Sequence, residues 1–163
     1  MSSVNEYFSG EKTQCWIGIV LGVISIGLAL YFLLHLKTDL YKGVAYPFLI
    51  IPVLLIMICA GVVWRTPHDI ERVTNFIQQV PEKIATEEIP RMQRVLKSFK
   101  VIKIVEAVLF VAGLALVAYG ATKGSDVAKG VGIGIAIQSA MMYAFDYFAH
   151  ERGKAYWEFL QSL

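Results

Sequence analysis

The chain has 163 residues and a net charge of +2, with 56% apolar and 17% charged residues. Soluble domains carry about 25% charged residues, so this composition is typical of an integral membrane protein. Four windows at about 15–34, 44–64, 104–122 and 130–149 hold almost no charge, and each approaches the ~20 residues that a helix needs to cross a bilayer. The remaining residues are too few for a separate soluble domain. This excludes an enzyme whose chemistry takes place in an aqueous domain of its own.

These windows predict an all-α, polytopic bundle of four transmembrane helices in a single membrane domain. We expect spans at about 15–35, 44–65, 101–122 and 128–149, a helical connection at 66–100 and a tail at 150–163. The polar N-terminal 14 residues contain no small-residue cleavage site, so the first span should stay in the mature protein. The two cysteines form no disulfide or redox motif. The basic residues are interleaved with acidic ones, so the sequence predicts no nucleic-acid partner.

The basic residues predict the orientation of the chain in the membrane. With four spans, the N-terminus, the segment 65–103 between the second and third spans and the tail share one side, which carries 11 of the 15 Lys and Arg residues. The positive-inside rule therefore places both termini in the cytoplasm. All three tryptophans fall at that level, and Tyr41, Tyr46 and Tyr119 mark the opposite interface, as in aromatic belts. The size and style of the chain favour a bacterial inner membrane.

The 66–100 connection has helical features of its own. Thr66 followed by Pro67 is typical of the start of a new helix, with a capping hydroxyl and a proline in the first turn. An apolar stripe then recurs at helical spacing, which predicts an amphipathic helix on the membrane surface or under the bundle. The stripe consists of Ile70, Val73, Ile77 and Val80. After Pro90 the apolar period continues into the third span, which predicts one long helix that projects from the membrane.

Matching segments suggest that the chain contains two similar halves. Lys42-Gly43-Val44 and Lys129-Gly130-Val131 lie 87 residues apart, and so do Arg65 and Arg152. Gly27-Leu28-Ala29-Leu30 and Gly113-Leu114-Ala115-Leu116 lie 86 apart. These offsets predict a parallel repeat of two hairpins about an axis normal to the membrane. Chance matches among Gly and Leu are the alternative.

Two carboxylates inside predicted spans are the leading candidates for function. Glu106 and Asp146 fall at matching depths near the cytoplasmic ends of the third and fourth spans. Ionisable residues there are costly and are functional candidates by default. Asp146 belongs to a polar stripe on the fourth helix that also contains Ser139, Tyr143 and His150. We interpret these residues as a ligand-binding or proton-linked site, with Gln138 as the deepest strongly polar side chain.

The same residues also allow other interpretations. Asp146 and His150 at a spacing of four, with Glu106 and His68, are candidate ligands for a metal ion. Alternatively, ion pairs with Lys103, Arg65 or Arg152 would only fix the register of the helices. No HExxH motif, phosphate-binding loop or nucleophile elbow is present, and no cofactor is predicted.

Other residues carry predictions about helix shape and packing. Pro52 lies inside the second span and predicts a kink. Two small-residue motifs allow close contact between helices, either within the bundle or between protomers. These are Gly18 with Gly22, and Gly130 with Gly134.

Together these features favour a small membrane protein that forms homo-oligomers and binds or passes a small solute or ion through a cytoplasm-facing polar pocket. One alternative is a non-catalytic assembly protein that docks a protein partner through its cytoplasmic helices. An intramembrane enzyme acting on a lipid would require the carboxylate and histidine cluster to be catalytic. An enzyme is the less favoured class.

Overall fold

The computed structural model describes residues 2–163, which form an all-helical bundle without strands. Its elements are α1 (Ser2–Tyr31), η1 (Phe32–Leu36), α2 (Asp39–Gln79), η2 (Ile84–Glu88), α3 (Ile89–Lys123) and α4 (Asp126–Gln161). The elements η1 and η2 are short π-helical segments that continue α1 and precede α3. Each of the four long helical stretches contains a window that is long and apolar enough to cross a membrane. The predicted fold class is confirmed at this level.

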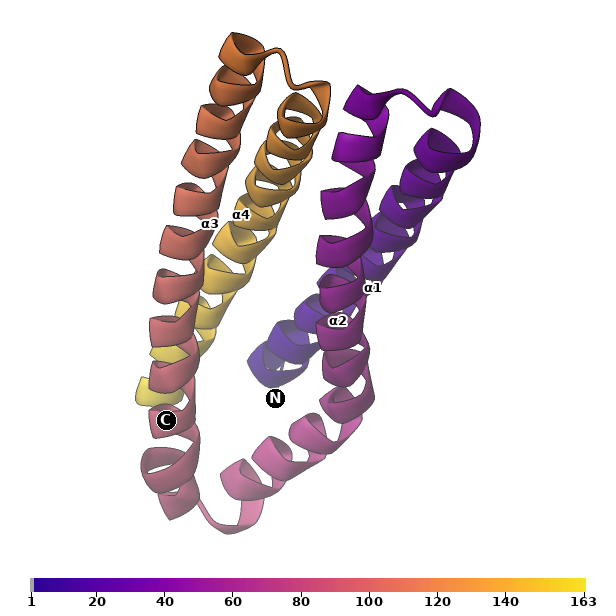
Figure 1. Ribbon diagram of the computed structural model, residues 1–163. Helices are drawn as coiled ribbons and strands as arrows, with labels where there is room; N and C mark the ends of the chain where they lie inside the picture. Colours follow the sequence, from indigo (N-terminus) through magenta and orange to yellow (C-terminus); the bar gives the residue numbers. More distant parts are fainter. Residues whose placement is uncertain (1) are drawn as a thin grey trace.

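The helices form two hairpins that lie side by side (Figure 1). The α1–α2 and α3–α4 turns lie at one end, and both termini lie towards the other end with the link between α2 and α3. Helices α2 and α4 pack against each other in the centre, while α3 packs mainly on α4 and α1 mainly on α2. Much of the apolar surface of α3 is therefore exposed outside the bundle.

The two hairpin turns share two local features. Lys37 (φ 53°) and Gly124 (φ 68°) occupy left-handed conformations at the ends of the first helix of each hairpin. The next helix then begins with an acidic residue that pairs with a lysine three positions later: Asp39 with Lys42 at 3.0 Å, and Asp126 with Lys129 at 2.9 Å. Acidic groups stabilise the first turn of a helix because they oppose its dipole. Each of these matching positions is 87 residues from its counterpart.

Backbones approach closely where α2 meets α4. A Cβ atom added to Gly43 would lie 2.9 Å from the Cα atom of Gly130, and one added to Gly130 would lie 2.9 Å from the Cα atom of Gly43. One turn further along, a Cβ atom on Gly134 would lie 3.0 Å from the ring of Pro47. Only glycine permits this separation at the Gly43–Gly130 crossing.

Both predicted glycine motifs are used within the chain. Gly130 and Gly134 face α2, as just described. On α1, an added Cβ at Gly18 would meet the Sγ atom of Cys59 at 3.1 Å, and one at Gly22 would meet the side chain of Ile56 at 2.8 Å. The glycines therefore bring both α1 and α4 close to α2.

The structure contradicts the prediction of a new helix at Thr66. Helix α2 runs without a break from Asp39 to Gln79, through Pro47, Pro52 and Pro67. The Thr66 hydroxyl donates a hydrogen bond of 2.7 Å to the carbonyl of Val62, as it does in a helix interior, and does not cap a new helix. Figure 1 shows that the C-terminal part of α2 changes direction relative to the part beside α1. The kink at Pro52 itself stays a prediction.

A compact apolar core joins all four helices at the end that holds the termini. Val73 of the predicted stripe is fully buried in it, and Ile70 and Ile77 pack against it. The N-terminal 14 residues also take part, because α1 begins at Ser2 and buries three of their side chains. The core consists of Val4, Tyr7, Phe8, Val73, Phe76, Ile84, Met92, Tyr156 and Leu160. The single long helix predicted after Pro90 is confirmed, since α3 runs from Ile89 to Lys123.

Candidate functional site

The packing of α3 on α4 brings the two predicted carboxylates together. Glu106 is 5% exposed, and Asp146 is partly buried on the facing helix. Their carboxyl groups interact with each other, and the ammonium group of Lys103 acts on both. Neither carboxylate oxygen of Glu106 has a hydrogen-bond partner of normal geometry among residues 2–163. Buried polar atoms are normally satisfied, so this carboxyl group is exceptional.

Lys103 and His150 form a second contact between α3 and α4. The Lys103 Nζ atom lies 2.9 Å from the Nδ1 atom of His150. Because an ammonium group only donates, Nδ1 must accept here, which places the ring proton on Nε2. The buried Nε2 atom has no partner in the described part of the chain. His150 is therefore neutral in this arrangement.

A groove of about 350 Å³ between α3 and α4 exposes one side of this cluster. Its walls are mostly apolar, and its polar groups are Glu106, Ser139 and Tyr143. The Ser139 hydroxyl is buried and without a hydrogen-bond partner in residues 2–163. The groove opens sideways from the helix pair, because Tyr143 and all four apolar wall residues are exposed. Its lining residues are Glu106, Ala107, Phe110, Val111, Ser139, Ala140 and Tyr143.

Gln138 lies outside this groove. It is almost completely buried, and its Nε2 atom donates a 3.3 Å hydrogen bond to the hydroxyl of Ser25 on α1. The Gln138 Oε1 atom has no partner among the described residues. The contact ties α4 to α1 in the interior of the bundle.

The predicted arginine partners of the carboxylates bind other groups. Arg65 lies 3.6 Å from both Glu11 and Asp69. Arg152 donates to the side chain of Gln14. Of the three predicted cations, only Lys103 therefore lies at the carboxylate pair.

The predicted metal ligands are not assembled as a set. His68 is exposed on α2. Among residues 2–163, no group of three or more His, Cys, Asp or Glu side chains could hold a metal ion. Glu106, Asp146 and Lys103 thus remain as the charged groups of the site.

A second charged cluster, absent from our sequence predictions, surrounds Glu88. This carboxylate is 1% exposed. It accepts hydrogen bonds from Arg91 at 2.6 and 2.9 Å, from Arg72 at 3.4 Å and from the Tyr156 hydroxyl at 3.2 Å. Asp69 is linked to it through Arg72, at 3.0 Å. Burial and the charge of Glu88 raise the pKa of the Tyr156 phenol, which keeps it a donor at neutral pH.

The sequence offered one signal for this cluster. Glu88 precedes Arg91 by three residues, the spacing of neighbours on a helix. Arg72 and Tyr156 come from distant parts of the chain, and nothing in the local pattern links them to Glu88. Cys15 and Cys59 are likewise brought into contact by the packing of α1 on α2, as free thiols.

No protein-family model matches the chain, and neither the curated proteins nor the solved structures include a significant match.

Proposed function

We propose that the protein binds a cation, either a proton or a small cationic solute, at Glu106 and Asp146, and passes it along the α3–α4 groove. One observation carries the proposal. Glu106 is buried beside the carboxyl group of Asp146, and apart from that carboxyl group its two oxygens have no hydrogen-bond partner in the described chain. A carboxyl group in that environment is free to accept a proton or a cation.

The charge balance of the site supports a cationic ligand. With both carboxyls ionised, two negative charges face the single positive charge of Lys103, since His150 is neutral. The site then holds an excess of one negative charge in a region of low dielectric, where isolated charge is costly. One bound proton or monovalent cation removes this excess.

The groove provides a route and a preference for its ligand. Its apolar walls suit a solute that carries apolar groups besides its positive charge, and the Ser139 and Tyr143 hydroxyls offer polar contacts. Because the groove opens sideways, such a solute would enter from the bilayer. A proton would instead reach Glu106 from the end that holds Lys103 and His150.

Proton flux into proteoliposomes tests this proposal. A potassium diffusion potential set with valinomycin drives protons inward, and a trapped pH-sensitive dye reports them. We expect the protein to conduct and Glu106→Gln to lower the rate about tenfold or more, because an amide cannot take up and release the proton as a positioned carboxyl group does. Glu158→Gln is the matched control because Glu158 is exposed and forms no ion pair within residues 2–163. Equal rates for wild type and Glu106→Gln would refute the proposal.

A labelling experiment tests the binding step separately. Hydrophobic carbodiimides react with protonated carboxyl groups inside membranes, so we expect modification at Glu106 in wild type. Modification should be lost in Glu106→Gln and should fall as the pH rises. A Glu106 that stays unmodified at all pH values would contradict a proton-binding role.

We further propose that the chain lies in a bacterial inner membrane with both termini in the cytoplasm. The end of the bundle that holds the termini and the α2–α3 link (Figure 1) carries 11 of the 15 basic residues, which supports this orientation. We also propose that the two hairpins are copies related by an axis parallel to the helices. Residues that lie on a two-fold axis contact their own equivalents. The close contact of Gly43 with Gly130, which are 87 residues apart, therefore supports this relation.

The docking alternative has weaker support. Its apolar stripe on α2 packs into the core of the same chain, apart from the exposed Val80. A protein partner would have to use another surface. Self-association stays a prediction, and the exposed apolar face of α3 is the surface available for it.

A further inference from the structure

The start of α3 carries a dense array of positive charge. Arg91, Arg94, Lys97, Lys100 and Lys103 recur every three residues, and no acidic residue lies between Glu88 and Glu106. The apolar part of α3 follows immediately. Clusters of four or more basic residues at the end of a membrane span are typical of contacts with anionic lipids.

The middle of this array has no counter-charge. Arg91 pairs with Glu88, and Lys103 contacts His150. Arg94, Lys97 and Lys100 are exposed, and no carboxylate in residues 2–163 forms an ion pair with them. Among residues 2–163, the Arg94 guanidinium forms a single long hydrogen bond, of 3.4 Å, to the carbonyl of Pro90 on its own helix. Its planar face of donors is therefore available to a ligand.

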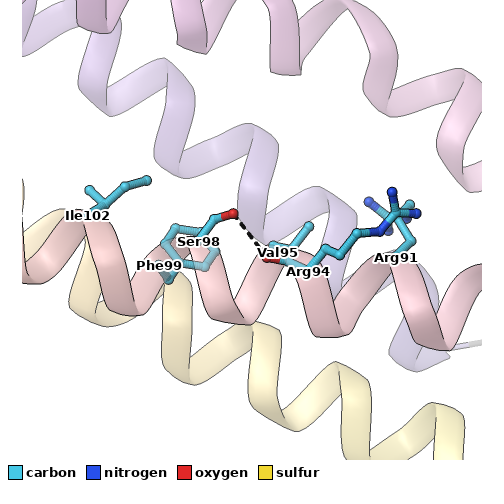
Figure 2. Close-up of a pocket in the computed structure, with 6 residues that line it drawn as sticks. All are labelled: Arg91, Arg94, Val95, Ser98, Phe99 and Ile102. Atoms are coloured by element: carbon cyan, nitrogen blue, oxygen red, sulfur yellow. Dashed lines mark hydrogen bonds between the residues drawn. The ribbon is translucent and has the colours of Figure 1, made fainter.

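Two adjoining surface hollows lie beside this array. One of about 330 Å³ runs from Arg91 and Arg94 past Ser98 to Phe99 and Ile102 (Figure 2). The second, of about 580 Å³, shares Arg94, Ser98 and Ile102 with the first. It adds Lys97 and Val101 to the lining. Figure 2 shows the two arginines at one end of the row and Ile102 at the other. The surface is thus cationic at one end and apolar at the end nearer the span.

We propose that this surface binds an anionic phospholipid, with the headgroup phosphate at Arg94 and Lys97 and an acyl chain along Val101 and Ile102. A guanidinium group fits a phosphate with two parallel hydrogen bonds, and a lysine adds charge. Val101 and Ile102 are exposed and continue into the apolar surface of α3. A soluble phosphate compound would use only the cationic end of this surface.

Thermal melting of the purified full chain in a neutral detergent tests the proposal. The probes are phosphatidylglycerol and phosphatidylcholine with the same short acyl chains, and inorganic phosphate at equal concentration. We expect phosphatidylglycerol to raise the melting temperature and the other two to have little effect. The affinity measured from this titration should fall about tenfold or more in the double variant Arg94→Gln/Lys97→Gln, since each basic residue near a membrane surface contributes about fivefold.

Lys37→Gln/Lys123→Gln is the matched control. It also removes two exposed lysines that lack ion pairs in residues 2–163, but at the opposite end of the bundle. It should keep the affinity of wild type. An equal affinity in the Arg94/Lys97 double variant would overturn the proposal, and so would an equal response to phosphatidylcholine. A full response to inorganic phosphate alone would replace the lipid by a soluble anion.

Discussion

The same type of residue plays opposite parts at two places in this molecule. Glu88 and Glu106 are both buried carboxylates on the α3 side of the bundle. Glu88 accepts from two arginines and a tyrosine, so its charge is fully compensated. Glu106 has a second carboxyl group beside it, and the charge of a single lysine, Lys103, acts on both. Because of this difference, we assign a structural role to Glu88 and ligand binding to Glu106.

Tyr156→Phe should destabilise the protein through the Glu88 cluster. The substitution keeps the ring, which stacks on Tyr7 with centroids 4.2 Å apart, and removes only the hydroxyl that donates to Glu88. A hydrogen bond to a charged group contributes about 1.5–3 kcal/mol, so the melting temperature should fall measurably. Tyr119→Phe is the control because Tyr119 is exposed at the other end. Equal melting of both variants would show that the Tyr156 hydroxyl contributes nothing.

Sequence reasoning at this scale found the isolated charges and missed the compensated ones. Glu106 and Asp146 stand out because each interrupts a long apolar run. Glu88 lies near Glu82 and Glu87 in a polar segment, and only its exposure of 1% distinguishes it. That burial comes from Arg72 and Tyr156, which are 16 and 68 residues away. No local pattern encodes such partners.

At the scale of single elements, proline did not end the helix. Thr66-Pro67 is a good start signal, because the N–H that proline lacks would be unpaired at the first helical position anyway and its fixed φ suits a helix. In α2 the Thr66 hydroxyl instead bonds back to Val62, and the helix bends and continues. Prolines are tolerated in membrane helices where side chains and neighbours satisfy the freed groups. The spans were predictable from charge-free windows, whereas this boundary depended on tertiary packing.

Val73→Asp should disrupt the core beneath the bundle. Val73 is fully buried among residues from all four helices, so a carboxylate there would lack both water and a partner, at a cost of about 3 kcal/mol or more. We expect little monodisperse protein on size-exclusion chromatography in detergent. Val80→Asp places the same charge at an exposed position directly after the end of the same helix and should behave as wild type. Normal yield of Val73→Asp would mean that this core is dispensable.

At the scale of the whole molecule, both termini and the α2–α3 link share one end. Single cysteines placed at Asp39 or Ser125 should react with a membrane-impermeant maleimide added outside intact cells. Cysteines at Gln79 or Ser162 should react only after permeabilisation, as the positive-inside rule requires. The parent chain is the control, because its two native cysteines lie within the apolar part of the bundle. Labelling of position 79 from outside would reverse the proposed orientation.

The crossing of α2 and α4 holds the two hairpins together, and the proposed repeat predicts that its two sides are equivalent. Gly43 and Gly130 each occupy the space that a Cβ atom of the other would need, at 2.9 Å. Alanine at either position should therefore push the hairpins apart and cost about 1–3 kcal/mol, the scale of overpacking in a tight interface.

Gly61→Ala is the control for this substitution, because an added Cβ there would meet no atom of the described residues within 4 Å beyond its own stretch of helix. It should stabilise α2 by about 0.5–1 kcal/mol through the higher helix propensity of alanine. Melting temperatures in one detergent would compare all three single variants. The melting temperatures of Gly43→Ala and Gly130→Ala should fall by similar amounts. The melting temperature of the double variant should fall by less than the sum of the two, since the first alanine already separates the helices. A large effect at one glycine with none at the other would contradict an equivalent crossing.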